Sequence, residues 1–224
     1  MGREIEMKIA LTQEEFLSVY KAIYGEEKYS KIQFGKVQLL FKQDKNYSRY
    51  KTHKERKASS EPKVIRLRKE EIIELEKPVD FTNQNMSKVS EIFKSFCSPE
   101  NKNQSFFTIK YKTRQDGIEF NREDETFVEK QEVIEEMLEI AGYECWFTKE
   151  KCAWSSHCTS SILDNTDFHL ELEAVNNLLY LEVEVTESDK NPDAIKNGII
   201  EFIKNLKINP EHKDSRSWVE ILSE

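Results

Sequence analysis

Charged and apolar residues alternate in seven short segments of this chain, and the charges of each segment fall on one face. The first segment, REIEMKIAL at residues 3–11, places Glu4, Glu6 and Lys8 at every second position with apolar residues between them. Successive side chains of a β-strand point to opposite faces, so this spacing predicts strands with one charged and one apolar face. The pattern recurs at Arg66/Arg68, Lys110/Lys112, Arg122/Asp124, Lys149/Lys151, Glu171/Glu173 and Glu182/Glu184.

The charged faces have two readings. One face of an antiparallel sheet is commonly solvated and charged, and for a single strand this reading suffices. Like charges two residues apart repel each other, however, and gain nothing from cross-strand pairing unless an opposite pair lies beside them. The seven segments carry eight basic and seven acidic groups, so convergence on a common interior would nearly balance the charges. We therefore predict that the charged faces line the inside of a closed barrel.

Amphipathic helices accompany these strands. Apolar residues at helical spacing predict helices over residues 13–24, 131–141 and 192–206, and Thr12 with Glu15 forms a capping-box pattern before the first. Strands are expected at residues 4–10, 31–41, 64–68, 107–112, 118–128, 145–154, 168–175 and 179–185, with a short amphipathic piece at 218–222. These elements lack strict strand–helix alternation. They predict an α+β fold, an eight-stranded closed antiparallel β-barrel with helices packed outside.

Two stretches depart from the alternation. Residues 42–63 are rich in Lys, Arg and Ser, which is loop composition, although a ribbon could run through part of them. Residues 70–104 combine Pro78, a short helical pattern at 87–96 and a polar run at 98–104, which predicts an insertion with a mobile end. The length of 224 residues suits one domain, so we expect a single tunnel domain over residues 1–224 that carries this insertion.

The charge balance excludes some kinds of partner. A net charge of −8 argues against a general nucleic-acid surface or a membrane surface, because both need a basic excess. The sequence has no run of 18 apolar residues, and charges throughout its first twenty residues leave no core for a signal peptide. The four cysteines are too few and too irregular for a disulfide scaffold, and the absence of a C-x-x-C pair disfavours a zinc site. A soluble, cytoplasmic protein is expected.

The chemistry of the predicted interior indicates its ligand. Fifteen charges inside a barrel are tolerated only if they are hydrated, paired or bound to a ligand. Lysine and arginine bind phosphate oxygens, whereas clustered carboxylates bind Mg²⁺ or Mn²⁺. A polyphosphate accompanied by a divalent metal satisfies both sets of side chains at once.

A series of short motifs runs from residue 4 to residue 222. It begins with EIEMK at 4–8, RLR at 66–68 and FTIK at 107–110, followed by Arg122 with Asp124. KEK at 149–151 with Trp154, LEVE at 181–184 and SWVEIL at 217–222 complete it. In residue type and order the series resembles the motifs of the CYTH family of triphosphate tunnel metalloenzymes. That family includes class IV adenylyl cyclases, thiamine triphosphatases and inorganic triphosphatases.

The resemblance implies a tunnel that binds a small-molecule triphosphate with Mg²⁺ or Mn²⁺. The residues that it implies for phosphate binding are Lys8, Arg66, Arg68, Lys110, Lys112, Arg122, Lys149 and Lys151. The metal ligands that it implies are Glu4, Glu6, Asp124, Glu171, Glu173, Glu182 and Glu184. The candidate proton acceptors in catalysis are Glu4, Glu6 and a neutral Lys8.

Some positions depart from the family pattern or leave their register open. Lys151 stands where the family often has arginine, so a bidentate grip on phosphate would be lost there. The spacing to the E-x-E strand does not decide between Glu171 and Glu173 as the acidic residue of the preceding strand. Lys112 and Arg114 face either the tunnel mouth or solvent.

The expected activity is metal-dependent hydrolysis of inorganic triphosphate or of a small organic or nucleoside triphosphate. An adenylyl cyclase that makes cyclic AMP from ATP is the alternative within the family, although nothing in the sequence identifies an adenine pocket. A non-catalytic polyphosphate or nucleotide sensor is the alternative of another class, and the intact acidic motifs argue against it. An ordinary barrel with solvent-facing charges is a third reading. The oligomeric state, monomer or homodimer, stays open.

Overall fold

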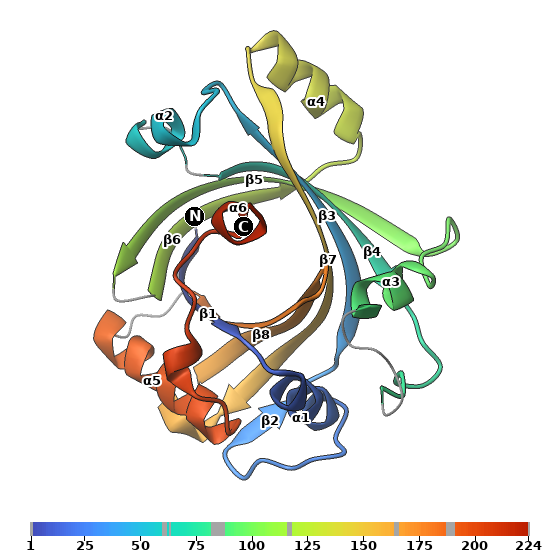
Figure 1. Ribbon diagram of the computed structural model, residues 1–224, viewed down its shortest axis with the longest axis vertical. Coiled ribbons are helices and arrows are strands. Elements are labelled where there is room, and N and C mark those ends of the chain that lie inside the picture. Colours follow the sequence, from blue (N-terminus) through green and yellow to red (C-terminus); the bar gives the residue numbers. More distant parts are fainter. Residues whose placement is uncertain are drawn as a thin grey trace.

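Antiparallel strands form the body of the molecule. The computed structural model describes residues 2–59, 62, 64–81, 88–115, 118–163, 166–186 and 191–223. The strands in these ranges are β1 (Gly2–Ala10), β2 (Ile32–Phe34), β3 (Gln38–Ser48), β4 (Val64–Ile73), β5 (Lys102–Gln115), β6 (Ile118–Phe127), β7 (Glu144–Ser160), β8 (Thr166–Val175) and β9 (Leu178–Thr186). Their order is β2-β7-β3-β4-β5-β6-β1-β9-β8, and β8 also pairs with β7. The sheet therefore closes on itself, and Figure 1 looks into the resulting barrel.

The short strand β2 extends β3 along the same side of β7. Ile32 of β2 pairs with Ser160, and Gln38 at the start of β3 pairs with Ser155. Between them the Gly35 amide donates to the His157 carbonyl at 2.8 Å. A Cβ at Gly35 would lie 2.7 Å from that oxygen, so the close approach of the two backbones requires glycine. The predicted closed eight-stranded antiparallel barrel is confirmed, with β2 as an additional strand.

Helices pack around the barrel. They are α1 (Gln13–Ile23), α2 (His53–Ala58), α3 (Val89–Lys94), α4 (Gln131–Ile140), α5 (Pro192–Asn205) and α6 (Trp218–Leu222), with the 3₁₀ turns η2 (Ser161–Leu163) and η3 (Pro210–His212). The three main predicted helices are confirmed as α1, α4 and α5, and the Thr12/Glu15 capping box forms at α1. In Figure 1 α1 and α5 lie outside the barrel, whereas α6 lies within its outline. Among the described helices, none has the length and apolar character needed to cross a bilayer.

The main hydrophobic core lies outside the barrel wall. Ile5, Met7 and Ile9 of β1 are buried in one cluster with Phe16 of α1 and Phe202 of α5. Because alternate residues of a strand face opposite ways, this packing turns the charged residues of β1 toward the barrel interior. The usual arrangement, with apolar residues inside and charged residues outside, is inverted here.

The structure corrects two expectations about irregular stretches. Within residues 42–63, β3 continues to Ser48 and α2 follows, so this segment is not simply a loop. Within residues 70–104, the first four residues belong to β4 and the last three to β5. The expected helix forms as α3, and the ring centroid of its Phe93 lies 4.6 Å from that of Trp154. Residues 82–87 of the expected insertion and Gly117 of the expected turn lie outside the described residues.

A charged tunnel as the candidate active site

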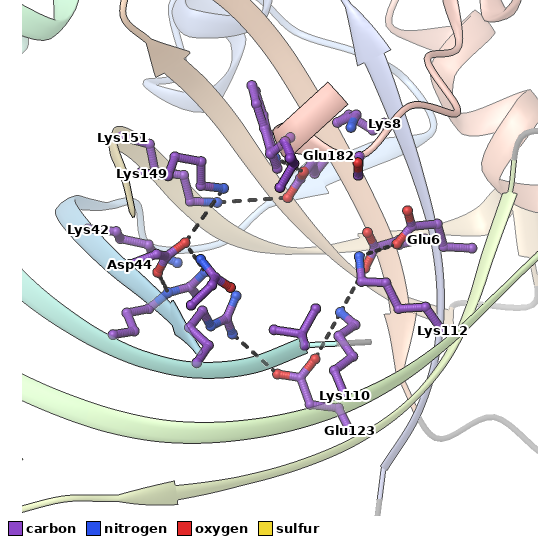
Figure 2. Close-up of a pocket in the computed structure, with 18 of the residues that line it drawn as sticks. Glu6, Lys8, Lys42, Asp44, Lys110, Lys112, Glu123, Lys149, Lys151 and Glu182 are labelled. Carbon is purple, nitrogen blue, oxygen red and sulfur yellow. Dashed lines mark hydrogen bonds and ion pairs between the residues drawn. The ribbon is translucent and has the colours of Figure 1, made fainter. Parts of the chain in front are cut away.

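A cavity of about 530 Å³ lies inside the barrel, lined by side chains from all eight barrel strands. The charged doublets of β1, β4, β5, β7 and β9 face it, as do His169 and Glu171 of β8. Figure 2 shows lysines and carboxylates from different strands pointing toward one another across this space. The reading in which these charges face bulk solvent on the outside of a barrel is therefore wrong.

Basic side chains of β4 and β7 surround a buried carboxylate of β3. Arg68 donates to both oxygens of Asp44, from Nε at 2.7 Å and from Nη2 at 3.3 Å. The Lys149 ammonium lies 3.6 Å from the same carboxylate. Although burial opposes ionisation, Arg68, Arg66 and Lys149 hold the pKa of Asp44 well below its usual value.

Lys149 is a buried lysine whose surroundings oppose its positive charge. Burial, together with repulsion from Lys151, lowers the pKa of Lys149 to about 7. Its ammonium also lies 4.6 Å from the centre of the Trp218 ring. An anionic ligand beside Lys149 would favour its charged form, so this wall of the tunnel is suited to binding phosphate.

Three carboxylates from β1 and β9, which we call the β1–β9 triad, form a first candidate metal site. Glu4, Glu6 and Glu184 each place one oxygen within 4.8 Å of the other two. The Lys110 ammonium lies 2.7 Å from Glu4, 3.0 Å from Glu6 and 2.8 Å from Glu123. Burial raises the pKa of Glu4 to about 7, opposed by Lys110 and reinforced by Glu184.

Three carboxylates from β8 and β9, which we call the β8–β9 triad, form a second candidate site. Glu171, Glu173 and Glu182 also place one oxygen each within 4.8 Å of one another. The Lys151 ammonium lies 2.9 Å from Glu171 and 3.8 Å from Glu182, and it also contacts Glu173. Glu173 is fully buried, and its Oε2 has no hydrogen-bond partner among the described residues. Burial and repulsion from Glu182 raise its pKa to about 8.

Both triads fit a divalent cation. Each offers three carboxylate oxygens, which are the ligands that Mg²⁺ and Mn²⁺ prefer. Glu173 Oε2 has no hydrogen-bond partner among the described residues, and burial raises the pKa of both Glu4 and Glu173, so a cation bound at either triad would favour the charged forms of these carboxylates. Glu171 and Glu173 both belong to the β8–β9 triad, and of the two Glu171 borders the cavity.

The expectation that Arg122 and Asp124 line the tunnel is wrong. β6 instead turns Glu119, Glu123 and Glu125 toward the cavity. Arg122 is exposed, with its guanidinium carbon 4.4 Å from the centre of the Tyr111 ring. Asp124 shares the outer face of β6 with Arg122, because the two are separated by one residue. Lys112 lines the cavity and lies 2.5 Å from Glu119, whereas the Arg114 side chain lies outside the described residues.

Comparisons with known proteins identify the fold. No family model matches the sequence, and no curated protein matches it. The PH1819 protein of Pyrococcus horikoshii is similar with a TM-score of 0.63 and 13% identity, over 98% of each chain. A proposed adenylate cyclase of Vibrio parahaemolyticus has a TM-score of 0.58 and 16% identity, over 99% of this chain and 98% of that one.

A plant protein adds a description of activity. HpAC1 of Hippeastrum, a proposed adenylyl cyclase whose structure is described as revealing a dominant triphosphatase activity, has a TM-score of 0.54 and 12% identity. The match covers 100% of this chain and 95% of that one. The chain has the triphosphate tunnel fold. At these identities the likeness establishes the fold, and the cavity described above is the tunnel of that fold.

Sequence reasoning missed several side chains that line the tunnel. Those on the barrel strands are Lys42, Asp44, Asn46, Val64, Glu70, Glu119, Glu123, Glu125, Trp146, Phe147 and His169. Lys42 contacts Glu171 and lies 3.4 Å from Glu70, so it belongs to the ion-pair network around the β8–β9 triad. Residues 42–46 are all polar, so no alternation of charged and apolar residues marked the inward-facing side chains of β3.

The segment before and within α6 covers part of the tunnel. Lys8 donates to the Arg216 carbonyl at 2.5 Å, and its ammonium lies 4.9 Å from the Trp218 ring centre. Trp218 donates from its indole nitrogen to Glu182 at 3.2 Å. Burial lowers the pKa of Lys8. The closing SWVEIL motif therefore contacts groups of both signs in the tunnel.

Proposed function

We propose that the protein is a divalent-metal-dependent hydrolase of triphosphates, acting on inorganic triphosphate or on a small organic or nucleoside triphosphate. The observation that carries the proposal is the convergence of lysines, arginines and two carboxylate triads on one tunnel. The likeness to HpAC1, described as having a dominant triphosphatase activity, supports the same class of reaction.

The lysines of the tunnel can exchange their partners when metal and substrate bind. Lys151 contacts all three carboxylates of the β8–β9 triad, and Lys110 contacts two of the β1–β9 triad. If Mg²⁺ or Mn²⁺ takes over those carboxylates, both ammonium groups become available to phosphate oxygens. The remaining phosphates would be held by the basic side chains around Asp44, which are Arg66, Arg68 and Lys149.

Phosphoryl transfer depends mainly on positioning and on stabilisation of charge. When bound, a divalent ion neutralises charge that develops on the scissile phosphates. The chain itself contributes the basic side chains that orient the phosphates and a group that accepts a proton from the attacking water. Glu4, Glu6 and Lys8 are the candidates for that group, and all three line the tunnel.

A product analysis tests the proposal. Purified protein is incubated with inorganic triphosphate, thiamine triphosphate, ATP or RNA bearing a 5′-triphosphate, each with Mg²⁺ or Mn²⁺, and the products are identified. We expect release of phosphate or diphosphate. Cyclic AMP as the main product from ATP would support cyclase activity instead, the second candidate, which the similarity to proposed adenylate cyclases favours. Tight binding of all substrates without turnover would support a sensor.

Variants connect the activity to the triads. Glu6→Gln and Glu182→Gln each remove one carboxylate from a triad, and we expect turnover to fall by more than about 100-fold, since loss of a mere outer-shell partner costs about 10- to 100-fold. Asp124→Asn is the matched control on the outer face of β6, and its rate should equal that of the wild type. An unchanged rate in Glu6→Gln and Glu182→Gln would remove the triads from the active site.

A further inference from the structure

Aromatic side chains line one part of the tunnel, although they are not ligands for phosphate groups or for a divalent metal. Trp146 and Phe147, two neighbours at the start of β7, both border the cavity, and Arg56 of α2 borders it beside them. Inorganic triphosphate has only charged oxygens to offer, so it would leave both rings without a ligand. A substrate with a further, apolar part would use them.

A β-bulge turns both rings toward the tunnel. Adjacent residues of a regular strand point to opposite faces, so one of the two rings would normally face outward. Between β3 and β7, however, Asn46 pairs with Phe147 and Tyr47 pairs with Cys145. Trp146 is therefore the extra residue of a bulge. Bulges at barrel rims and beside active sites commonly redirect a side chain, and here the result is a pair of adjacent rings on the cavity.

The two rings and Arg56 form a preformed aromatic wall. The ring centroids of Trp146 and Phe147 lie 5.6 Å apart with 35° between the ring planes. The guanidinium carbon of Arg56 lies 3.6 Å from the centre of the Trp146 ring, a cation–π contact. Arg56 also donates to the Tyr50 carbonyl at 2.9 Å, which fixes the guanidinium to the backbone. Both rings are partly exposed.

The aromatic wall adjoins the basic wall of the tunnel. Phe147 and Lys149 lie two residues apart on the inner face of β7. Asn46 of β3 pairs with Phe147 of β7 on one side and with Arg66 of β4 on the other, so one strand, β3, separates the aromatic wall from Arg66. A triphosphate held by Lys149 and Arg66 would therefore direct its organic end toward Trp146 and Phe147.

We infer that the tunnel selects triphosphates that bear a planar aromatic group, the chemistry of a nucleoside triphosphate, and that this group stacks on Trp146 and Phe147. The inference rests on the proposed function and narrows its substrate class. Arg56, which stacks on Trp146 and borders the cavity, adds a positive charge to the aromatic wall. Aromatic rings stack on the π-face of any base. The aromatic wall therefore favours substrates that carry a planar ring over those that carry none, without discriminating among bases.

Kinetic selectivity tests the inference. We compare kcat/KM for ATP with kcat/KM for inorganic triphosphate in the wild type and in Trp146→Ala, Trp146→Phe and Phe147→Leu. Loss of a stacked base should reduce the ATP-to-triphosphate ratio in Trp146→Ala by roughly 5- to 150-fold, and Trp146→Phe should restore most of it. Phe127→Ala is the matched control, because Phe127 is 60% exposed and does not border the cavity, and its ratio should stay unchanged.

Binding separates this inference from the proposed function. Calorimetric titration with a non-hydrolysable imido analogue of ATP, and with imidotriphosphate, reports stacking without turnover. Weaker binding of the ATP analogue alone in Trp146→Ala supports the inference even if no triphosphate is hydrolysed, an outcome that would contradict only the proposed function. Equal affinities of the wild type for both analogues, or equal losses for both in Trp146→Ala and Phe147→Leu, would overturn the inference. Phe147→Leu serves as the test if Trp146→Ala fails to fold.

Discussion

The β8–β9 triad and the β1–β9 triad each gather three carboxylates around one lysine, but they differ in burial. The side chains of Glu171, Glu173 and Glu182 are 8%, 0% and 22% exposed. Those of the β1–β9 triad, Glu4, Glu6 and Glu184, are 14%, 13% and 23% exposed. Water can therefore reach every carboxylate of the β1–β9 triad, whereas Glu173 of the β8–β9 triad is cut off from it.

The two triads also differ in how their lysine is shared. Lys151 contacts every member of the β8–β9 triad, whereas Lys110 divides its contacts between two members of the β1–β9 triad and Glu123. Charges interact more strongly where water is excluded, and a buried carboxylate without a partner is costly. Burial therefore makes the β8–β9 triad depend on its lysine for the stability of the folded state, and exposure to water relaxes that dependence in the β1–β9 triad.

The largest expected effect comes from removing each lysine. Lys151→Met removes the cation that contacts the fully buried Glu173, and we expect the free energy of unfolding to fall by about 3–5 kcal/mol in metal-free buffer. Lys110→Met should lose less, since Glu4, Glu6 and Glu123 retain contact with water. Urea denaturation in EDTA measures both. Mn²⁺ should recover part of the stability of Lys151→Met, and equal losses in the two variants would contradict the comparison.

A smaller effect is expected from pH at the more buried triad. The pKa of Glu173 is raised from 4.5 to about 8, so folding disfavours its charged form. Its stabilising contribution as a neutral acid is present at pH 5, and the penalty for ionisation develops as the pH rises from about 4.5 toward 8. Glu173→Gln removes that penalty. The variant should gain stability relative to the wild type between pH 5 and pH 9, by a few kcal/mol at most, because one unit of pKa is worth about 1.4 kcal/mol.

The matched variant in the other triad is Glu184→Gln. Its side chain is 23% exposed, against 0% for Glu173, so the same substitution should change the stability much less. Thermal melts of both variants in EDTA, at pH 5, 7 and 9, give the comparison. A larger change in Tm in Glu184→Gln than in Glu173→Gln would show that burial does not distinguish the triads.

The alternation predicted the strands whose outer faces pack on helices. The outer residues of β1, such as Ile5 and Met7, are buried in the core with α1 and α5, so they had to be apolar. The contrast with Glu4 and Glu6 was then visible in the sequence. Both triads lie on strands of this kind, which is why their six carboxylates could all be identified before the structure.

The same reasoning failed where both faces of a strand are polar. Gln43 and Lys45, on the outer face of β3, bond Glu150 at 2.9 Å and Glu135 at 2.6 Å. No apolar face remained to mark Lys42 and Asp44 as inward-facing. The bulge at Trp146 was equally invisible, because an extra residue in one strand is defined only by its pairing with another strand. Alternation thus locates a tunnel lining only where the outer wall is apolar.

The smallest expected effect tests the register of β6, where the sequence placed Asp124 inside and the structure places Glu123. Glu123 lies 2.8 Å from Lys110 and 3.5 Å from Arg66, so Glu123→Gln should destabilise the protein by about 1 kcal/mol. Asp124→Asn should stay within about 0.5 kcal/mol of the wild type, because it changes an outer-face residue. Urea denaturation at pH 7 measures both. Glu123→Gln also removes one of the three carboxylates that share Lys110, which leaves its interactions with Glu4 and Glu6. In this background, the loss of stability caused by Lys110→Met should come mainly from those two carboxylates. A larger loss of stability in Asp124→Asn than in Glu123→Gln would contradict this register of β6. Glu123 would then no longer be a partner of Lys110 in the comparison of the two triads.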